Sequence, residues 1–254
     1  MGFKLKSALY GVGLFCALLP SVWAKDHVII LAGQSNMMGR GKTIGLPPGY
    51  RNTPGNVHFF YQGREHRLAE FGFFGPEVSF AHTLARAYPR DRIFLIKHAA
   101  SGSYLKQWQP GQGLYNTLMR QISFVAQAYP IQQIDAIMWM QGESEAQSSA
   151  TVATQYSDQL QNFVTHLRRD LQSPNSLFVL GRISFQHPLL MNSINIVRSQ
   201  QQQAPQQIKN SLVVSTDGLT TMSDKLHYDS AGQVELGKRF ATAYIRRNSQ
   251  LARR

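Results

Sequence analysis

The sequence predicts a doubly wound, three-layer α/β domain, in which helices cover both faces of a five-stranded parallel sheet. Short apolar runs of strand type alternate with longer amphipathic segments along the chain. In the longest of these segments, residues 151–171, apolar side chains recur at helical spacing and form one face. We therefore expect the binding site beyond the carboxyl ends of the strands.

Residues 1–24 are predicted to be a secretory signal peptide. Two lysines precede an uncharged run rich in Leu, Val, Ala and Phe, which extends from residue 7 to Ala24. Two glycines and a proline interrupt this run, so it does not fit a membrane span of about 20 apolar residues. No transmembrane segment is therefore expected. We predict cleavage after Ala24 and a secreted or periplasmic protein, with residues 25–254 as a single domain.

Composition narrows the chemistry of this domain. The formal net charge is +12 at pH 7, but the basic residues are scattered, without a basic helix or an interleaved aromatic platform. Nucleic acid is therefore not an expected partner, whereas an anionic matrix or substrate stays open. Cys16, within the predicted signal, is the only cysteine. The exported chain is thus expected to use no disulfide, thiol nucleophile or cysteine-bound metal, and we predict no cofactor.

The first expected strand, residues 28–31, leads into Gly33-Gln34-Ser35-Asn36. Glycine permits a sharp turn and the close approach of a ligand, and a serine after a strand can begin a helix with its N–H group free. This arrangement presents the serine. Taken alone it is more simply an ordinary helix cap, and interpreting Ser35 as a nucleophile needs partners further along the chain. The chain then continues through Pro- and Gly-rich loops at 45–55, a short strand or hairpin arm at 57–61, and a helix at 78–88.

Four further strands are expected, at 93–99, 134–140, 177–183 and 212–215. Helices are expected between and after them, at 114–128, 151–171, 193–204 and 231–246. The glutamine-rich stretch 200–207 is interpreted as the exposed side of a helix and its following turn, without a function.

Polar residues follow these strands, and their convergence predicts a catalytic site. A serine hydroxyl is a weak nucleophile that needs an adjacent base, usually a histidine oriented by a third group. His227 fits that need, with Asp224 three residues before it; the alternative is a turn-capping aspartate beside a surface histidine. Candidate donors to an oxyanion are the N–H groups of Ser35 and Gly102 and the side-chain amide of Gln141, although both later segments can also be plain turns.

Four blocks occur in order along the chain: Gly33-Gln34-Ser35-Asn36-Met37, Gly75-Pro76-Glu77, Trp139-Met140-Gln141-Gly142-Glu143 and Asp224-Lys225-Leu226-His227. Together they resemble the blocks of SGNH hydrolases, specifically the branch of sialate O-acetylesterases and acetylxylan esterases. The resemblance covers most of the exported chain and implies a flavodoxin-like α/β/α fold. It further implies Ser35 as nucleophile, His227 as base and Asp224 as its orienting acid. The oxyanion hole would then consist of the Ser35 and Gly102 N–H groups and the Gln141 side chain.

The activity implied by this resemblance is that of a secreted serine esterase. It would remove O-acetyl groups from an acetylated carbohydrate, either sialic acid or a polysaccharide, through an acyl-enzyme intermediate and without a metal. Gly-Gln-Ser and Gln-Gly-Glu stand where the wider superfamily has Gly-Asp-Ser and Gly-x-Asn-Asp, which favours the carbohydrate-esterase branch over a lipase. A GDSL-like lipase or thioesterase and a non-catalytic carbohydrate-binding domain are the alternatives.

Supporting residues around the nucleophile follow from the same blocks. Gln34 and Asn36 flank Ser35, and the role of Glu143 is open: it could orient His227 in place of Asp224, or it could brace a loop.

Three residues are candidates for contact with the sugar. Trp108 and Tyr104 could stack on sugar rings, or they could be core aromatic residues. Arg182, at the end of the fourth expected strand, could meet a substrate carboxylate or form a structural ion pair. Sialic acid would use such a cation, whereas xylan would not.

Overall fold

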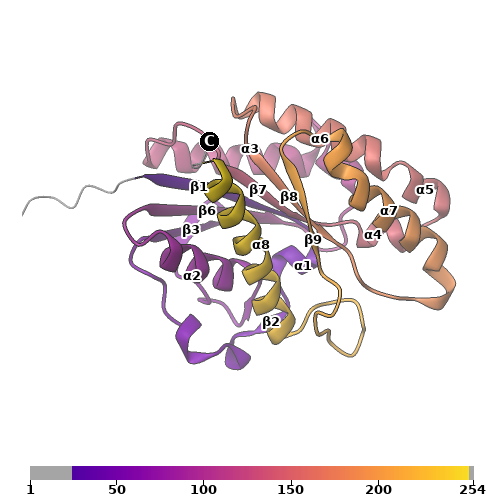
Figure 1. The fold of residues 1–254 in the computed structure, drawn as a ribbon, viewed down its shortest axis with the longest axis horizontal. Helices are drawn as coiled ribbons and strands as arrows, with labels where there is room; N and C mark the ends of the chain where they lie inside the picture. The colour runs from indigo at the N-terminus through magenta and orange to yellow at the C-terminus, as the bar shows by residue number, and fades with distance from the viewer. Residues whose placement is uncertain (1–24, 252–254) are drawn as a thin grey trace, which may run out of the picture.

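The computed structural model describes residues 25–251, so the predicted signal peptide lies outside the described residues. A seven-stranded sheet forms the centre of the fold, in the order β4-β3-β6-β1-β7-β8-β9 (Figure 1). Its central strand is β1 (Asp26–Gly33), which pairs in parallel with β6 (Arg92–Ala99) and with β7 (Ala136–Met140). The side chains of β1 from Ile29 to Ala32 are fully buried. This agrees with a sheet covered on both faces.

The outer strands extend the sheet to both sides. β8 (Leu177–Arg182) and β9 (Ser211–Ser215) follow β7, and β3 (Val57–Tyr61) pairs in parallel with β6. The short strand β4 (Arg64–His66) is antiparallel to β3 at the edge. All five predicted strands are present, but the sheet has two strands more than the five predicted. The sequence of β4 is polar and has no apolar run from which a strand could be predicted. Residues 57–61, which form β3, were predicted as a short strand or a hairpin arm and were not counted in the sheet.

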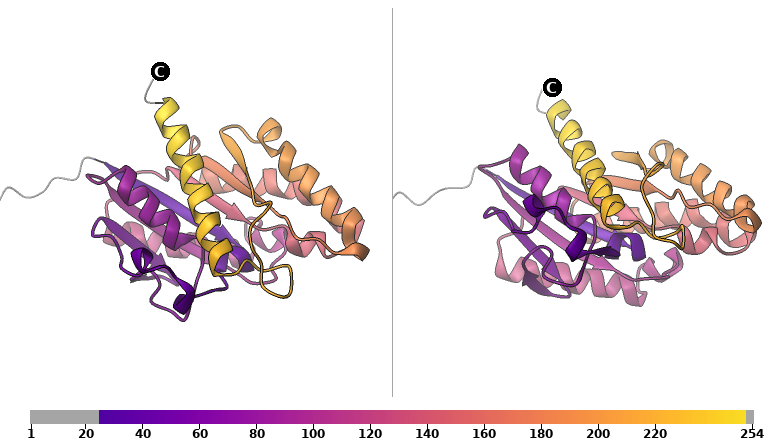
Figure 2. Two further views of the ribbon diagram at one scale, coloured as in Figure 1. Left: turned by 60° about the horizontal axis from the view of Figure 1, so that its bottom comes forward. Right: turned by 90° about the horizontal axis from the view of Figure 1, so that it is seen from below.

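Helices cover both faces of the sheet and confirm the predicted three-layer class. One face carries α2 (Glu77–Ala87) and α8 (Ser230–Leu251). The other carries α3 (Gly113–Ala128), α6 (Tyr156–Asp170) and α7 (Met191–Gln207), as Figure 2 shows. Within residues 25–251, no helix has both the length and the apolar character needed to cross a bilayer.

Shorter elements decorate the ends of the strands. The one-turn helices α1 (Ser35–Met38) and α4 (Glu143–Ala146) follow β1 and β7 directly. A small two-stranded sheet pairs β2 (Gly41–Lys42) with β5 (Phe73–Phe74).

The helix predicted at 151–171 is in fact two helices, α5 (Ala150–Thr154) and α6. The backbone opens at Gln155, where ψ is −8°. The opening places the Tyr156 ring in the core, where its hydroxyl donates to the Gln141 carbonyl oxygen at 3.0 Å. The first residue of α6 is thus hydrogen-bonded to the end of β7.

The order of the strands places a topological switch point at the end of β1. The strands on either side of β1 are β6 and β7, and the helices that precede them in the chain, α2 and α3, lie on opposite faces of the sheet (Figure 2). In open α/β sheets the loops separate at such a point and leave a crevice beyond the strand. Ser35 is the second residue after β1 and therefore lies at that crevice.

Candidate active site

Ser35 begins helix α1 at the end of a sharp turn. Gly33 has φ +146°, and a Cβ atom there would lie 2.0 Å from the Met140 carbonyl oxygen, so only glycine fits. The next N–H group, that of Gln34, donates to the same carbonyl at 2.9 Å. The Ser35 N–H group has no acceptor among the described residues. The sequence prediction of a serine with a free N–H at the start of a helix therefore matches the structure.

Ser35, His227 and Asp224 form a continuous hydrogen-bonded chain. His227 Nε2 lies 2.9 Å from Ser35 Oγ, and His227 Nδ1 lies 2.7 Å from Asp224 Oδ2. Ser35 is almost fully buried, whereas the histidine side chain keeps 20% of its surface exposed. The imidazole is thus within hydrogen-bonding reach of the serine hydroxyl before any side chain rotates.

Asp224 is the acid that contacts the imidazole. Its second oxygen, Oδ1, accepts the backbone N–H groups of Leu226 at 2.9 Å and of His227 at 3.0 Å. Partial burial acts against the charged form. The hydrogen bonds from His227 outweigh it and hold the pKa of the Asp224 carboxyl below its ordinary value. The carboxylate therefore remains ionised beside the histidine.

Glu143 braces the nucleophile helix instead of orienting the histidine. Its Oε1 accepts a hydrogen bond from Asn36 Nδ2 at 2.7 Å, and the side chain is buried. Burial raises the pKa of Glu143. The question that the sequence left open, between Asp224 and Glu143, is thus answered by their contacts.

Asn36 joins helix α1 to the loop that carries His227. Its Oδ1 accepts the Tyr228 N–H at 3.0 Å, and its Nδ2 donates to the Leu226 carbonyl oxygen at 3.2 Å as well as to Glu143. These two backbone groups belong to the residues directly before and after His227. One buried amide therefore fixes the histidine backbone relative to the serine.

Gln34 supports the loop after β7. Its Oε1 lies 3.3 Å from the Gly142 N–H nitrogen and 3.4 Å from that of Ser144. These contacts hold α4 against the turn that presents Ser35.

The Gly102 turn lies at the end of β6, next to the turn of Ser35. The Ala100 N–H donates to the Gly33 carbonyl oxygen at 3.0 Å and connects the two turns. Gly102 is exposed, has φ +67°, and its N–H has no acceptor among residues 25–251. Two free N–H groups, from Ser35 and Gly102, are thus present at adjoining strand ends.

Gln141 is engaged differently from the prediction. It is fully buried, and its Nε2 donates to the Ser103 carbonyl oxygen at 3.1 Å and to Glu145 Oε2 at 2.6 Å. An amide nitrogen carries two hydrogens, so none is left for an oxyanion. Gln141 braces the Gly102 turn through Ser103, and its predicted contribution to the oxyanion hole is corrected accordingly.

Gln201 supports the same strand end and was missed in the sequence. The glutamine-rich stretch was expected to be exposed, but Gln201 is fully buried. Its Nε2 donates to the Gln141 carbonyl oxygen at 2.9 Å, and its Oε1 accepts the Ile183 N–H at 2.9 Å. The helical position of this one glutamine, on the face of Ile194, Val197 and Ala204, was the signal that could have identified it.

The aromatic candidates for sugar contact fall into two groups. Trp108 is fully buried, donates its indole N–H to Ser103 Oγ at 3.0 Å and packs edge-on against Trp139 at 5.2 Å. It belongs to the core, so its predicted stacking on sugar was wrong. Tyr104 is half-buried, with Lys106 Nζ 5.5 Å from its ring centre, and its contact with sugar stays a prediction.

Arg182 forms a structural ion pair. Its guanidinium pairs with Asp217, which also binds Arg198 at 3.0 Å, and donates to Gln202 Oε1 at 2.8 Å. The structure therefore shows the structural ion pair that the sequence left open as one of two possibilities for Arg182.

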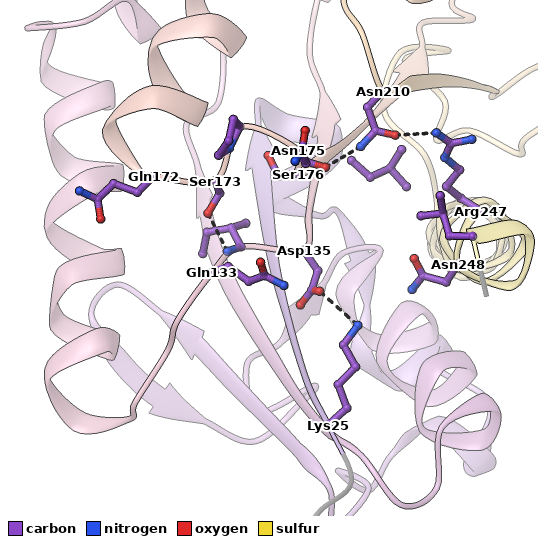
Figure 3. A pocket seen from close by; sticks show the side chains of 14 residues that line it. Lys25, Gln133, Asp135, Gln172, Ser173, Asn175, Ser176, Asn210, Arg247 and Asn248 are labelled. Atoms are coloured by element: carbon purple, nitrogen blue, oxygen red, sulfur yellow. Dashed lines mark hydrogen bonds and ion pairs between the residues drawn. The ribbon is translucent and has the colours of Figure 1, made fainter. Parts of the chain in front are cut away.

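A separate cavity lies at the opposite end of the sheet. It has a volume of about 220 Å³ and is lined by residues that precede the strands, among them Lys25, Asp135 and Asn210 (Figure 3). Lys25 pairs with Asp135 at 3.4 Å, and Arg247 donates to Asn210 Oδ1 at 3.0 Å. The polar groups of this cavity largely bind one another. Ser35 lies beyond the other end of β1. Within residues 25–251, no three His, Asp or Glu side chains are grouped as metal ligands would be.

The sequence model of the family described as "Carbohydrate esterase, sialic acid-specific acetylesterase" matches residues 25–246. The chain belongs to this family. The predicted membership in the SGNH carbohydrate-esterase branch is thereby confirmed, and the protein is an esterase. The matched range contains Ser35, Asp224 and His227.

Known relatives of this esterase agree with its fold. A probable carbohydrate esterase of Arabidopsis thaliana is 25% identical over 244 residues, which cover 87% of this chain and 90% of the plant protein. A crystal structure from Arabidopsis thaliana has a TM-score of 0.75 at 25% identity, covering 87% of this chain and 97% of that one. The crystal structure of NanS gives a TM-score of 0.73 at 16% identity, covering 89% and 98% of the two chains. Axe2, an acetylxylan esterase from Geobacillus stearothermophilus, gives 0.52 at 17% identity, covering 86% and 94%. The last two likenesses concern the fold alone.

Proposed function

We propose that this esterase removes O-acetyl groups from a carbohydrate by serine catalysis. The observation that carries the proposal is the hydrogen-bonded chain from Asp224 through His227 to Ser35. In the first step Ser35 Oγ bonds to the acetyl carbonyl carbon while His227 Nε2 takes the hydroxyl proton. The Ser35 and Gly102 N–H groups donate to the carbonyl oxygen as it becomes negative.

The acyl-enzyme then forms and is hydrolysed. The bond between the acetyl carbon and the sugar oxygen breaks, and His227 Nε2 gives its proton to that oxygen. Water next attacks the acetyl group on Ser35, again losing a proton to His227, and acetate leaves as the proton returns to Ser35 Oγ. Asp224 stabilises the imidazolium in both steps because its carboxylate lies 2.7 Å from Nδ1.

The test is hydrolysis of p-nitrophenyl acetate and release of acetate from an acetylated sugar by Ser35→Ala. We expect kcat/KM to fall by about 10³-fold or more, with an unchanged melting temperature. Ser199→Ala, at an exposed serine of α7, is the matched control and should behave like the wild type. Turnover by Ser35→Ala at the wild-type rate would exclude the proposal.

The rival functions give different outcomes in the same assay. A lipase or thioesterase would hydrolyse octanoyl esters faster than acetyl esters. A carbohydrate-binding domain without catalysis would bind glycan and release no acetate.

A further inference from the structure

A second cavity is lined by residues that follow Ser35 closely in the chain, beginning with Met38 at the end of α1. It has a volume of about 190 Å³. Its walls come from the end of α1 and the residues after it, from β3 and β6, and from the segment leading into α2, and they include Arg40, Tyr61, Phe71, Phe73, Glu77 and Lys97. The catalytic reaction proposed above uses none of these side chains.

Aromatic rings line this cavity, and two of them are exposed. Phe73 is 56% exposed and Phe71 is 43% exposed, and Tyr61 lies edge-on to Phe71 with ring centres 6.0 Å apart. Apolar surface left open beside a catalytic centre marks a binding region, and ring faces suit the C–H face of a sugar. The cavity therefore offers aromatic surface to a sugar, whereas Trp108 is buried in the core and offers none.

The charge of the cavity comes from Arg40. Lys97 also lines it, but Lys97 Nζ binds Glu77 Oε2 at 2.6 Å, so this pair is neutral as a unit. Arg40 has no carboxylate within ion-pair distance in the described part of the chain. Its Nε–H group is buried and has no acceptor among the same residues. A guanidinium in this state is suited to a ligand carboxylate, which it binds with two parallel hydrogen bonds.

Arg40 also connects the cavity to the reaction centre. Its Nη2 donates to Ser101 Oγ at 3.1 Å, and Ser101 directly precedes Gly102. A sugar in this cavity would consequently lie next to the N–H groups that receive the acetyl oxygen.

We propose that this cavity binds the ring of an O-acetylated sugar acid, with Arg40 on its carboxylate and the open aromatic rings against its apolar face. The inference rests on the proposed esterase function and assigns its specificity to Arg40. It gives Arg40 the role that the sequence suggested for Arg182. Sialic acids and uronic acids share the carboxylate that this site recognises.

The test compares acetate release from an O-acetylated sialic acid, an O-acetylated uronic acid and the carboxamide analogue of each. We expect the wild type to release acetate from each acid with a higher kcat/KM than from its carboxamide. Arg40→Gln should reduce this ratio by about 10- to 100-fold, mainly through KM, because a hydrogen bond to a charged group is lost. Arg40→Lys should restore part of it, since the charge is kept. The acid with the larger preference identifies which sugar acid fits the cavity.

Arg90→Gln removes the same charge at an exposed position before β6, at the amino end of the strands, and should keep the wild-type preference. The inference is overturned if the wild type treats acid and amide alike. It is also overturned if Arg40→Gln slows both by the same factor, which is what a purely structural contact with Ser101 would produce. Failure of the esterase function itself shows separately, as acetate release that persists in Ser35→Ala.

Discussion

At the scale of single residues, the pairing of Asp224 with His227 is local. All three hydrogen bonds that the carboxylate accepts come from residues 226 and 227, within one turn. A contact that spans three residues can be inferred from sequence, because a short turn brings the two side chains together. The position of Glu143 could not be inferred in this way, since it depends on a contact with Asn36 across 107 residues.

The two acids should therefore differ in their effect on catalysis. Asp224→Asn should lower kcat by about 10²-fold or more, because the amide can place the imidazole in the wrong tautomer and cannot stabilise its charged form. Glu143→Gln keeps the acceptor for Asn36 and should lower kcat by less than about tenfold. Steady-state kinetics on p-nitrophenyl acetate, with exposed Asp158→Asn as the control, compares them. A larger loss in Glu143→Gln than in Asp224→Asn would reverse the assignment.

Glu143 should also make stability depend on pH. Its folded-state pKa is raised by burial above the ordinary value of 4.5, so the folded chain holds this proton more tightly than the unfolded chain. For such a carboxyl the contribution to stability is present below the ordinary pKa and is lost as pH rises toward the raised one. The melting temperature of Glu143→Gln, relative to wild type, should increase between about pH 4 and about pH 8. A difference that is constant or falls with pH would contradict this.

The candidate site residues that the structure uses as structural contacts share one physical property. Gln141, Trp108 and Arg182 each find their partners on other segments, at Ser103 and Glu145, at Trp139, and at Asp217. The type of a residue shows which groups its side chain can bind. It does not show which of these groups the fold places beside it. The same limit hid Arg40, whose significance lies in having no acidic partner among the described residues.

At the scale of elements, α1 is a single turn that depends on contacts from its neighbours. Lys97 of β6 donates to the Met38 carbonyl oxygen at 2.7 Å and pairs with Glu77 of α2 at 2.6 Å. Glu77 in turn accepts the Gly75 N–H at 2.9 Å. The block Gly75-Pro76-Glu77 is thus explained as the support beneath the nucleophile helix.

Breaking this buried pair should destabilise the whole fold. Lys97→Met leaves a buried carboxylate without its cation and should lower the free energy of unfolding by about 3–5 kcal/mol. The double variant Lys97→Met/Glu77→Gln removes the unpaired charge while keeping an acceptor for Gly75, and should recover a large part of the loss. Urea denaturation measures both, with Lys209→Met as an exposed control. A double variant no more stable than Lys97→Met would show that the charge is not the cause.

Periodicity predicted most of the elements because apolar side chains must face the core at fixed intervals. Five of the seven strands of the main sheet and the main helices were found in this way. The polar edge strand β4 buries too little to leave such a pattern. The interruption at Gln155 leaves no mark in the apolar periodicity, which continues from α5 into α6.

At the scale of the whole molecule, the order of the strands locates the site more firmly than any motif. The switch point at β1 brings Ser35 near the start of the chain against His227, 192 residues later. The alternation of strand and helix types predicted that the segments after the strands lie at one edge of the sheet, and the resemblance to SGNH hydrolases singled out His227 among them.

We further propose that the protein is exported with loss of residues 1–24. The family match begins at residue 25, directly after the predicted cleavage site, which supports the proposal. Expression of the full chain in a secreting host should yield an exported protein that starts at Lys25, by intact mass and N-terminal sequencing. Ala24→Arg should leave the precursor uncleaved. Retention of residues 1–24 on the exported wild type would contradict the assignment.

The Asn36 contacts have a consequence for when activity appears during folding. The base and its acid both lie between the last strand and the last helix, and they become fixed only when Leu226 and Tyr228 meet Asn36. Every earlier strand can assemble while the serine remains inert. Ester turnover should therefore report when the loop that carries His227 docks on Asn36: in a refolding experiment we expect it to return no sooner than these contacts form, however early the sheet has formed.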